Sequence, residues 1–154
     1  MINIQVAEEI ELAEELTGLN DELERAARTA LELAGAEPAA GLTIVLTDDA
    51  QIQQLNSQFS GLDAPTDVLS FPAGELDLDS DELYLGDIVI SAPRALAQAS
   101  AGGHLYREEM QLLVVHGVLH LLGHDHGEPD EKQRMWALQS QALAALGCTI
   151  SSPP

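Results

Sequence analysis

The chain has 154 residues, a length that suits one compact domain, and 45% of them are hydrophobic while only 3% are aromatic. Its 26 acidic and 6 basic residues give a net charge of −20, which argues against DNA as a partner and against tight electrostatic binding of nucleic acid. A single cysteine excludes an internal disulfide, and no apolar run is long enough to span a bilayer. We therefore expect one domain, residues 1–154, in the cytoplasm and without a membrane partner.

Hydrophobic periodicity and turn residues predict the secondary structure. In chain order we expect a strand at residues 2–7, a helix at 20–34, a strand at 42–47, a helix at 48–59, strands at 66–71 and 84–90, and helices at 91–101, 105–122 and 130–146. Pro72 should stop the third strand, and the acid-rich residues 74–82 should form a solvated loop. The helix at 105–122 is apolar nearly all round, which is typical of a buried central helix. The predicted fold is α+β, with a four-stranded sheet packed around this helix.

Four of the five histidines lie within eleven residues, as His116, His120, His124 and His126. A spacing of four residues places His116 and His120 on one face of a helix, one turn apart. If Gly123 ends that helix in a left-handed turn, the chain can fold back and His126 becomes the third ligand, which we favour. If the helix continues, His124 instead shares the face of His120. Three imidazoles with one position left open are typical of a catalytic zinc site.

A zinc ion in such a site can activate a water molecule for hydrolysis of an amide or a phosphodiester. The peptidase motif H-E-x-x-H requires a glutamate after the first histidine, but this chain has Gly117 there. A metallopeptidase or other amide hydrolase is therefore the second hypothesis. Asp125, between two histidines, and Asp87, near the end of a strand, are candidates to orient a ligand or to take a proton.

Three segments of the chain resemble the YbeY family, which are bacterial endoribonucleases of rRNA maturation. The segments are His116–His126, Pro65–Pro72 and Leu85–Ser91, and the resemblance extends from about residue 42 to residue 146. It implies a zinc-dependent, single-strand-specific endoribonuclease acting in 16S rRNA 3′-end maturation and ribosome quality control. It also implies a mixed sheet, and one Zn²⁺ held by the residues matching His116, His120 and His126.

The implied partners are single-stranded rRNA and the ribosome or its assembly factors. The family typically has an arginine where this chain has Ser60, and a guanidinium suits a phosphate better than a hydroxyl does. We therefore expect Arg94 or Arg107, on helices flanking the site, to supply the missing cation. The loss of the arginine also keeps open a third hypothesis, a non-catalytic ribosome assembly factor in which the metal only stabilises the fold.

Overall fold

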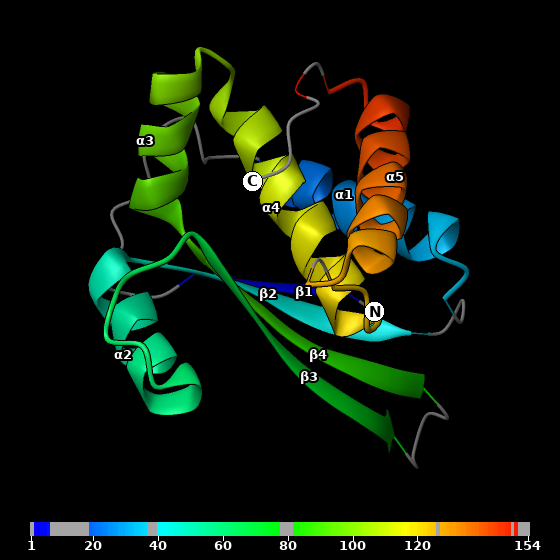
Figure 1. Ribbon diagram of the computed structural model, residues 1–154, viewed down its shortest axis with the longest axis horizontal. Helices are drawn as coiled ribbons and strands as arrows, with labels where there is room; N and C mark the ends of the chain where they lie inside the picture. Colours follow the sequence, from blue (N-terminus) through cyan, green and yellow to red (C-terminus); the bar gives the residue numbers. More distant parts are fainter. Residues whose placement is uncertain are drawn as a thin grey trace.

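The computed structural model describes residues 2–6, 19–36, 40–77, 82–125, 127–148 and 150. Its elements are, in chain order, β1 (Ile2–Val6), α1 (Asn20–Leu33), β2 (Gly41–Thr47), α2 (Asp49–Ser60), β3 (Val68–Asp77), β4 (Glu82–Ser91), α3 (Ala92–Gly102), α4 (Tyr106–Leu121) and α5 (Pro129–Ala145). Helices α1, α4 and α5 lie on one side of the sheet and α2 lies on the other (Figure 1). The predicted α+β fold is confirmed.

The four strands form one mixed sheet in the order β1-β2-β4-β3. β1, β2 and β4 run parallel, whereas β3 pairs antiparallel with β4. The mixed sheet implied by the family resemblance is therefore confirmed. Parallel neighbours need a crossover between them, which is why α1 connects β1 to β2, while β3 and β4 follow each other directly in the chain.

The third strand is longer than the sequence predicts. Pro72 does not stop it, because β3 continues to Asp77, and β4 begins within the supposed loop at Glu82. Proline is tolerated here because β3 is an edge strand and the pairing register shifts between Pro72 and Glu75. Opposite Pro72, Gly86 has a φ of +138°, and a Cβ there would lie 2.1 Å from the Phe71 carbonyl oxygen. The close approach of the two strands therefore requires glycine.

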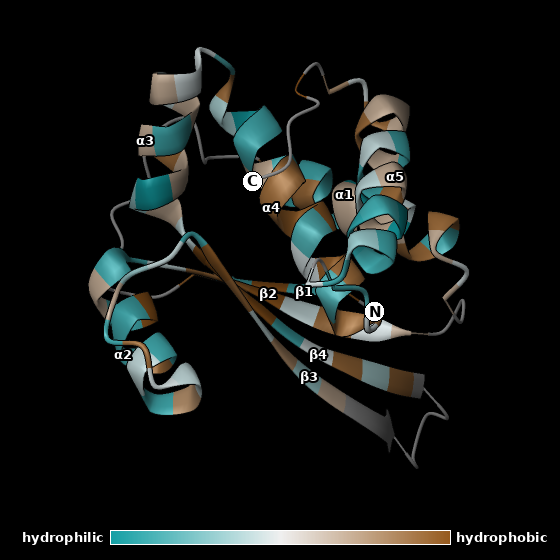
Figure 2. Cartoon of the chain, in the orientation of Figure 1, coloured by the Kyte–Doolittle hydropathy of each residue, from teal (hydrophilic) through white to brown (hydrophobic). Residues whose placement is uncertain are grey.

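Helix α4 is the centre of the core, as its apolar sequence predicts. Only Arg107 and His120 among its sixteen residues are not buried. Alternate residues of the sheet point toward it and are almost fully buried, namely Leu42, Ile44, Leu46, Ile88 and Ile90. Figure 2 shows the later part of β4 as hydrophobic without interruption, which agrees with the sequence Ile88-Val89-Ile90. None of the described helices is both long enough and apolar enough to cross a membrane.

A buried carboxyl near the start of α4 makes stability depend on pH. Glu109 is 5% exposed, and its Oε1 lies 3.0 Å from His104 Nε2. Burial raises the pKa of Glu109 despite this partner. A carboxyl whose folded-state pKa is raised contributes stability at low pH, and this contribution is lost as the pH rises through the folded-state value.

We therefore expect Glu109→Gln to gain stability relative to the parent chain as the pH rises from about 4.5 toward neutrality. The amide cannot ionise and can still accept a hydrogen bond from His104. Urea unfolding between pH 4 and pH 8 measures the difference. Glu131→Gln, at an exposed position of α5, is the control and should give a difference that changes little with pH. A Glu109→Gln difference that is constant with pH would contradict this assignment.

Candidate active site

The two histidines of α4 point at each other near the end of the helix. The Nε2 atoms of His116 and His120 are 3.0 Å apart, and the two rings meet at 75° with centroids 4.6 Å apart. The four-residue spacing produces this arrangement because it stacks side chains one turn apart on one helix face. His116 is 7% exposed, whereas His120 is only partly buried. The pair therefore has one buried member and one at the surface.

A glutamine of α5 orients the buried histidine. His116 Nδ1 lies 3.0 Å from the side-chain oxygen of Gln139, which is itself 2% exposed. An amide oxygen can only accept a hydrogen bond, so Nδ1 carries the proton and Nε2 presents its lone pair. This is the tautomer that a metal ligand bound through Nε2 requires, and such outer-shell partners are typical of metal sites.

Sequence reasoning missed Gln139. A weak signal for it was present, because Gln139 falls at helical spacing within the buried stripe of Met135, Ala142 and Leu143. A polar side chain on such a stripe needs a buried partner.

The histidine pair fits the chemistry of zinc. Two nitrogen ligands at typical zinc distances and a tetrahedral angle are about 3.3 Å apart, close to the 3.0 Å found here. The predicted third ligand, His126, lies outside the described residues. Within those residues, no group of three His, Cys, Asp or Glu side chains is placed to hold a metal ion. The complete set of His116, His120 and His126 therefore stays a prediction.

The end of α4 decides between the two routes to a third ligand. The helix stops at Leu121, and Gly123 adopts a φ of +95°. The His124 N–H bonds to the Leu119 carbonyl at 3.0 Å, and the Gly123 N–H bonds to the His120 carbonyl at 3.0 Å, which together form a Schellman turn. His124 therefore does not continue the helical face of His120.

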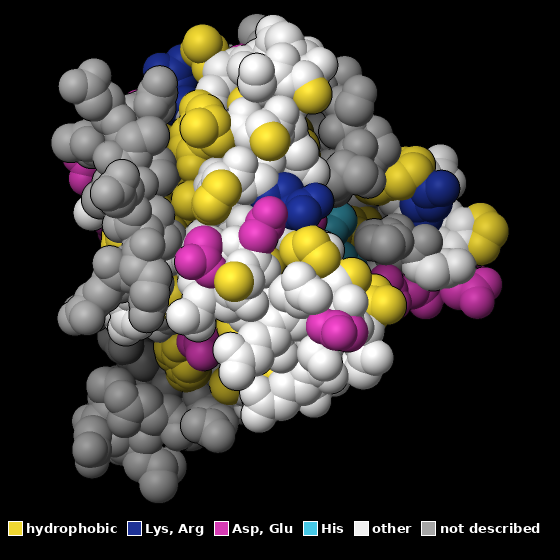
Figure 3. Space-filling view, turned by 90° about the vertical axis from the view of Figure 1, so that its left-hand side faces the viewer, with side chains coloured by type: hydrophobic (Ala, Val, Ile, Leu, Met, Phe, Trp, Pro, Cys, Tyr) yellow, Lys and Arg dark blue, Asp and Glu magenta, His cyan; other side chains and the backbone are white. Residues whose placement is uncertain are grey.

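A pocket of about 430 Å³ opens over the histidine pair. Its wall is the segment from Thr66 to Ser70, which enters β3, and His116 and His120 complete it. Ser70 Oγ donates to the Gly117 carbonyl at 3.2 Å and so holds β3 against α4. In the space-filling view, histidine atoms are visible within a hollow of the surface, close to a basic side chain (Figure 3). Asp125 is exposed in the turn after α4 and does not line this pocket, so its catalytic role stays a prediction.

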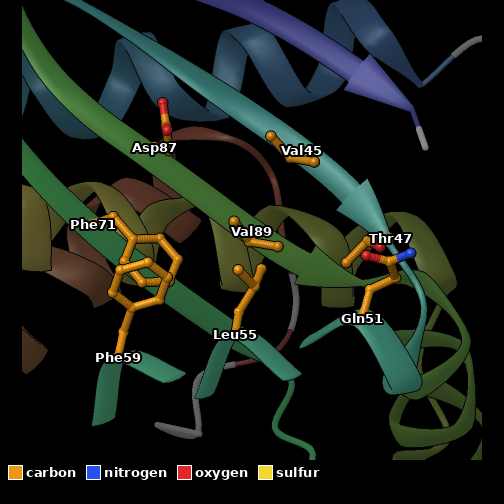
Figure 4. A pocket seen from close by; sticks show the side chains of 8 residues that line it. All are labelled: Val45, Thr47, Gln51, Leu55, Phe59, Phe71, Asp87 and Val89. Atoms are coloured by element: carbon orange, nitrogen blue, oxygen red, sulfur yellow. The ribbon is translucent and has the colours of Figure 1, made fainter. Parts of the chain in front are cut away.

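Asp87 does not belong to this site, contrary to its sequence-based candidacy. Successive residues of a strand face opposite sides of the sheet, and Ile88 faces α4. Asp87 therefore points to the α2 side, where its carboxylate accepts a hydrogen bond from the Tyr84 hydroxyl. There it borders a separate, mainly apolar pocket of about 450 Å³, which contains Phe59 and Phe71 (Figure 4).

Position 117 has no room for the glutamate of a peptidase. A Cβ on Gly117 would lie 2.7 Å from Ile88 Cγ2 and 3.2 Å from two further atoms of the same side chain. The glycine lets α4 pack closely on β4 just beside His116. The general base of the H-E-x-x-H motif is thus absent, and its position is filled by the sheet.

We expect Gly117→Ala to lower the free energy of unfolding by about 1 kcal/mol, since overpacking costs about 1–3 kcal/mol and the helix propensity of alanine returns up to about 1 kcal/mol. Urea unfolding measures this loss. In an Ile88→Ala background the contacting atoms are gone, so the same change should be neutral or stabilising. Equal losses in both backgrounds would show that the contact with Ile88 is not the cause.

The two candidate cations lie on different helices, Arg94 on α3 and Arg107 on α4. Arg107 is in the first turn of α4, about 13 Å along the helix from His116 and about 20 Å from His120. The expectation that it supplies a cation to the site is therefore wrong. Arg94 is near the start of α3, where the Ser91 N–H donates to the carbonyl of Asp67, a residue of the pocket wall. Ser60 is exposed as the last residue of α2 and does not line the histidine pocket.

The family model described as Endoribonuclease YbeY matches residues 4–147 of this chain. The chain belongs to the YbeY family. The resemblance carried by the histidine, Pro-Thr-Asp and Leu-Gly-Asp segments is thereby confirmed, and with it the assignment to a family of hydrolases. The first forty residues, which resemble the family only in general pattern, are included in the match except for the first three.

Curated relatives named Endoribonuclease YbeY agree with this assignment. The protein from Salinispora tropica is 42% identical over 135 residues, which cover 81% of this chain and 86% of the relative. The one from Pelotomaculum thermopropionicum is 45% identical over 139 residues, which cover 88% of this chain and 90% of the relative. The one from Mycolicibacterium paratuberculosis is 46% identical over 129 residues, which cover 79% of this chain and 73% of the relative.

The fold is also found in a solved structure. A solution structure of a Thermotoga maritima protein superposes with a TM-score of 0.57 and covers 98% of this chain and 95% of its own. The sequence identity of 24% limits that comparison to the fold. It agrees with the α+β architecture described above.

Proposed function

We propose that this YbeY-family chain is a zinc-dependent, single-strand-specific endoribonuclease that acts in the cytoplasm in 16S rRNA 3′-end maturation and ribosome quality control. The observation that carries the proposal is the convergence of His116 and His120 Nε2 at the base of an open pocket, with Gln139 selecting the ligand tautomer. Its partners would be single-stranded rRNA and the ribosome or its assembly factors.

The side chains of the pocket have distinct tasks in this proposal. His116, His120 and His126 would hold one Zn²⁺, which supplies a Lewis acid for a phosphoryl oxygen and lowers the pKa of a water molecule. Gln139 keeps His116 in the required tautomer, and the hydrogen bond from Ser70 to the Gly117 carbonyl keeps the wall in place. The buried face of His116 excludes bulk water from one side of the site.

The size of the pocket supports a single-stranded substrate. A volume of about 430 Å³ falls in the range of small-molecule sites, which suits one nucleotide. The histidines lie at its base, between α4 and the entry to β3, so a scissile phosphate has to enter the hollow. An unpaired strand can present a single nucleotide to this hollow, whereas a duplex keeps its nucleotides paired and stacked.

The metallopeptidase hypothesis is weakened by Gly117, where the packing of Ile88 leaves no place for the general base. The assembly-factor hypothesis predicts a metal that stabilises the fold without turnover. A chelator would then lower the melting temperature while no RNA is cut under any condition.

Metal removal and RNA cleavage, measured on the same preparation, test the proposal. The zinc-loaded chain should cut a single-stranded RNA carrying the 3′ end of 16S rRNA, and should leave the same sequence intact when it is annealed to its complement. Chelation should abolish cleavage, and added Zn²⁺ should restore it. Intact single strands with every divalent metal tested and across pH 6 to 9 would refute the nuclease and favour the assembly factor.

A further inference from the structure

A chain of net charge −20 has few cations with which to hold RNA. Its six basic residues are Arg25, Arg28, Arg94, Arg107, Lys132 and Arg134. Of these, Arg94 is connected to the wall of the histidine pocket, through its pairing with Asp49 and through the hydrogen bond between Ser91 and Asp67. The contacts of its guanidinium therefore bear on how the chain could hold RNA at this pocket.

The Arg94 side chain is held in a fixed orientation by a carboxylate. Its Nε lies 3.0 Å from Asp49 Oδ1 and its Nη2 lies 3.2 Å from Asp49 Oδ2, a two-point pairing that joins the starts of α3 and α2. Ser91 Oγ donates to the same Asp49 Oδ1 at 2.7 Å. These bonds use two of the five N–H donors of a guanidinium, and the side chain remains 35% exposed. The group is oriented and still able to bind an anion.

The pairing places Arg94 beside a residue of the pocket wall. Asp67 lines the histidine pocket, its carbonyl accepts the Ser91 N–H at 2.9 Å, and its carboxylate accepts from Gln98 Nε2 at 3.4 Å. The hydrogen bond to Asp49 raises the pKa of Arg94, and the charges of Asp49 and Asp67 raise it further. Arg94 therefore lies within electrostatic reach of the pocket.

The charges at this edge of the pocket would otherwise repel RNA. Asp49 and Asp67 are both acidic, and the α3 side of the pocket has Arg94 as the cation that offsets them. A phosphodiester approaching the histidines from this side meets two carboxylates and one guanidinium. A guanidinium already oriented by a carboxylate loses little freedom when it binds an oxyanion, which favours affinity.

We propose that Arg94, oriented by Asp49, is the phosphate contact that guides a single-stranded RNA into the histidine pocket. The inference rests on the proposed nuclease function for its substrate, although its test measures binding alone. An alternative role for the ion pair is purely structural, to join α2 to α3. The two roles predict different salt dependences of RNA binding for Arg94→Ala.

Binding of a fluorescently labelled single-stranded RNA, measured by anisotropy in EDTA over a series of salt concentrations, tests the proposal. We expect Arg94→Ala to weaken binding about tenfold at low salt, as loss of a charged hydrogen bond does. The slope of log K against log salt should fall by about 0.7, the value for one phosphate contact on a single strand. Arg94→Lys should keep the slope and weaken binding less, because it retains the charge and loses the two-point pairing.

Two further variants separate a phosphate contact from a structural ion pair. Arg28→Ala, the matched control, removes an arginine of α1 that pairs with Glu24 at 3.1 Å, and it should leave the slope unchanged. Asp49→Asn removes the two-point pairing that orients Arg94 but keeps the positive charge of Arg94, so the salt slope should remain that of the parent chain. If Arg94 were only structural, Asp49→Asn and Arg94→Ala would lower the melting temperature alike, and neither would alter the salt slope.

The outcomes distinguish this inference from the proposed function. An unchanged slope in Arg94→Ala, or a parent chain that does not bind the RNA even at low salt, overturns the role of Arg94. Either result leaves nuclease activity to be decided by the cleavage assay. Conversely, a chain that binds RNA through Arg94 and never cuts it would retain this inference and refute the nuclease.

Discussion

Replacement of His120 by alanine is expected to abolish both zinc binding and RNA cleavage. His120 Nε2 lies 3.0 Å from His116 Nε2 at the opening of the pocket, so its loss removes one of the two described nitrogens that converge there. Removal of an outer-shell partner typically costs about 10–100-fold in metal affinity or activity, and loss of a ligand itself should cost more than 100-fold. Metal analysis of the purified protein and single-turnover cleavage measure the two effects.

The neighbouring histidines provide the controls. His124→Ala should retain zinc and activity, because the Schellman turn at Gly123 takes His124 off the helical face of His120. His126→Ala should behave like His120→Ala if His126 is the third ligand. Loss of zinc from His124→Ala with full retention in His126→Ala would exchange the two assignments. Circular dichroism checks that each variant is folded.

Gln139→Leu is expected to reduce zinc affinity by about 10–100-fold while the fold is preserved. Leucine has a similar volume, but it cannot accept the proton of His116 Nδ1, which lies 3.0 Å from the Gln139 oxygen. The imidazole is then free to adopt the tautomer with Nε2 protonated, which cannot bind a metal through that atom. Competition with a zinc-sensing dye measures the affinity.

Gln141→Leu is the matched control, since Gln141 is exposed on the same helix. It should change neither zinc affinity nor cleavage. Gln139→Glu should retain or raise zinc affinity, because a carboxylate accepts the same hydrogen bond. Equal affinities for Gln139→Leu and the parent chain would show that Gln139 does not control the tautomer of His116.

The local sequence was sufficient to predict most elements and the histidine pair. The four-residue spacing on an apolar helix depends only on helical geometry, and the end of α4 follows from the freedom of Gly123 to adopt a positive φ. The error at Pro72 arose because a proline stops a strand only where its missing N–H matters. At the edge of a sheet, next to a register shift, it does not.

The contacts that complete the site join residues far apart in the chain. Gln139 is 23 residues from His116, and Ser70 is 47 residues from Gly117. No periodicity or motif in the sequence indicates that these residues pair. The same holds for Arg94 and Asp49, which are 45 residues apart. The choice between Arg94 and Arg107 likewise depends on a tertiary contact, the hydrogen bond from the Ser91 N–H to the Asp67 carbonyl, which brings the start of α3 to the pocket wall.

By itself, the sequence determined the helix that carries the histidines, the turn that ends it, and the family to which the chain belongs. These properties depend on side-chain spacing, on backbone freedom and on short motifs, all of which are local. Only the tertiary structure decided which side of the sheet Asp87 faces, which polar side chain orients His116, and which cation adjoins the pocket. Those outcomes depend on the packing of helices and strands against one another, and this packing is set by the whole core.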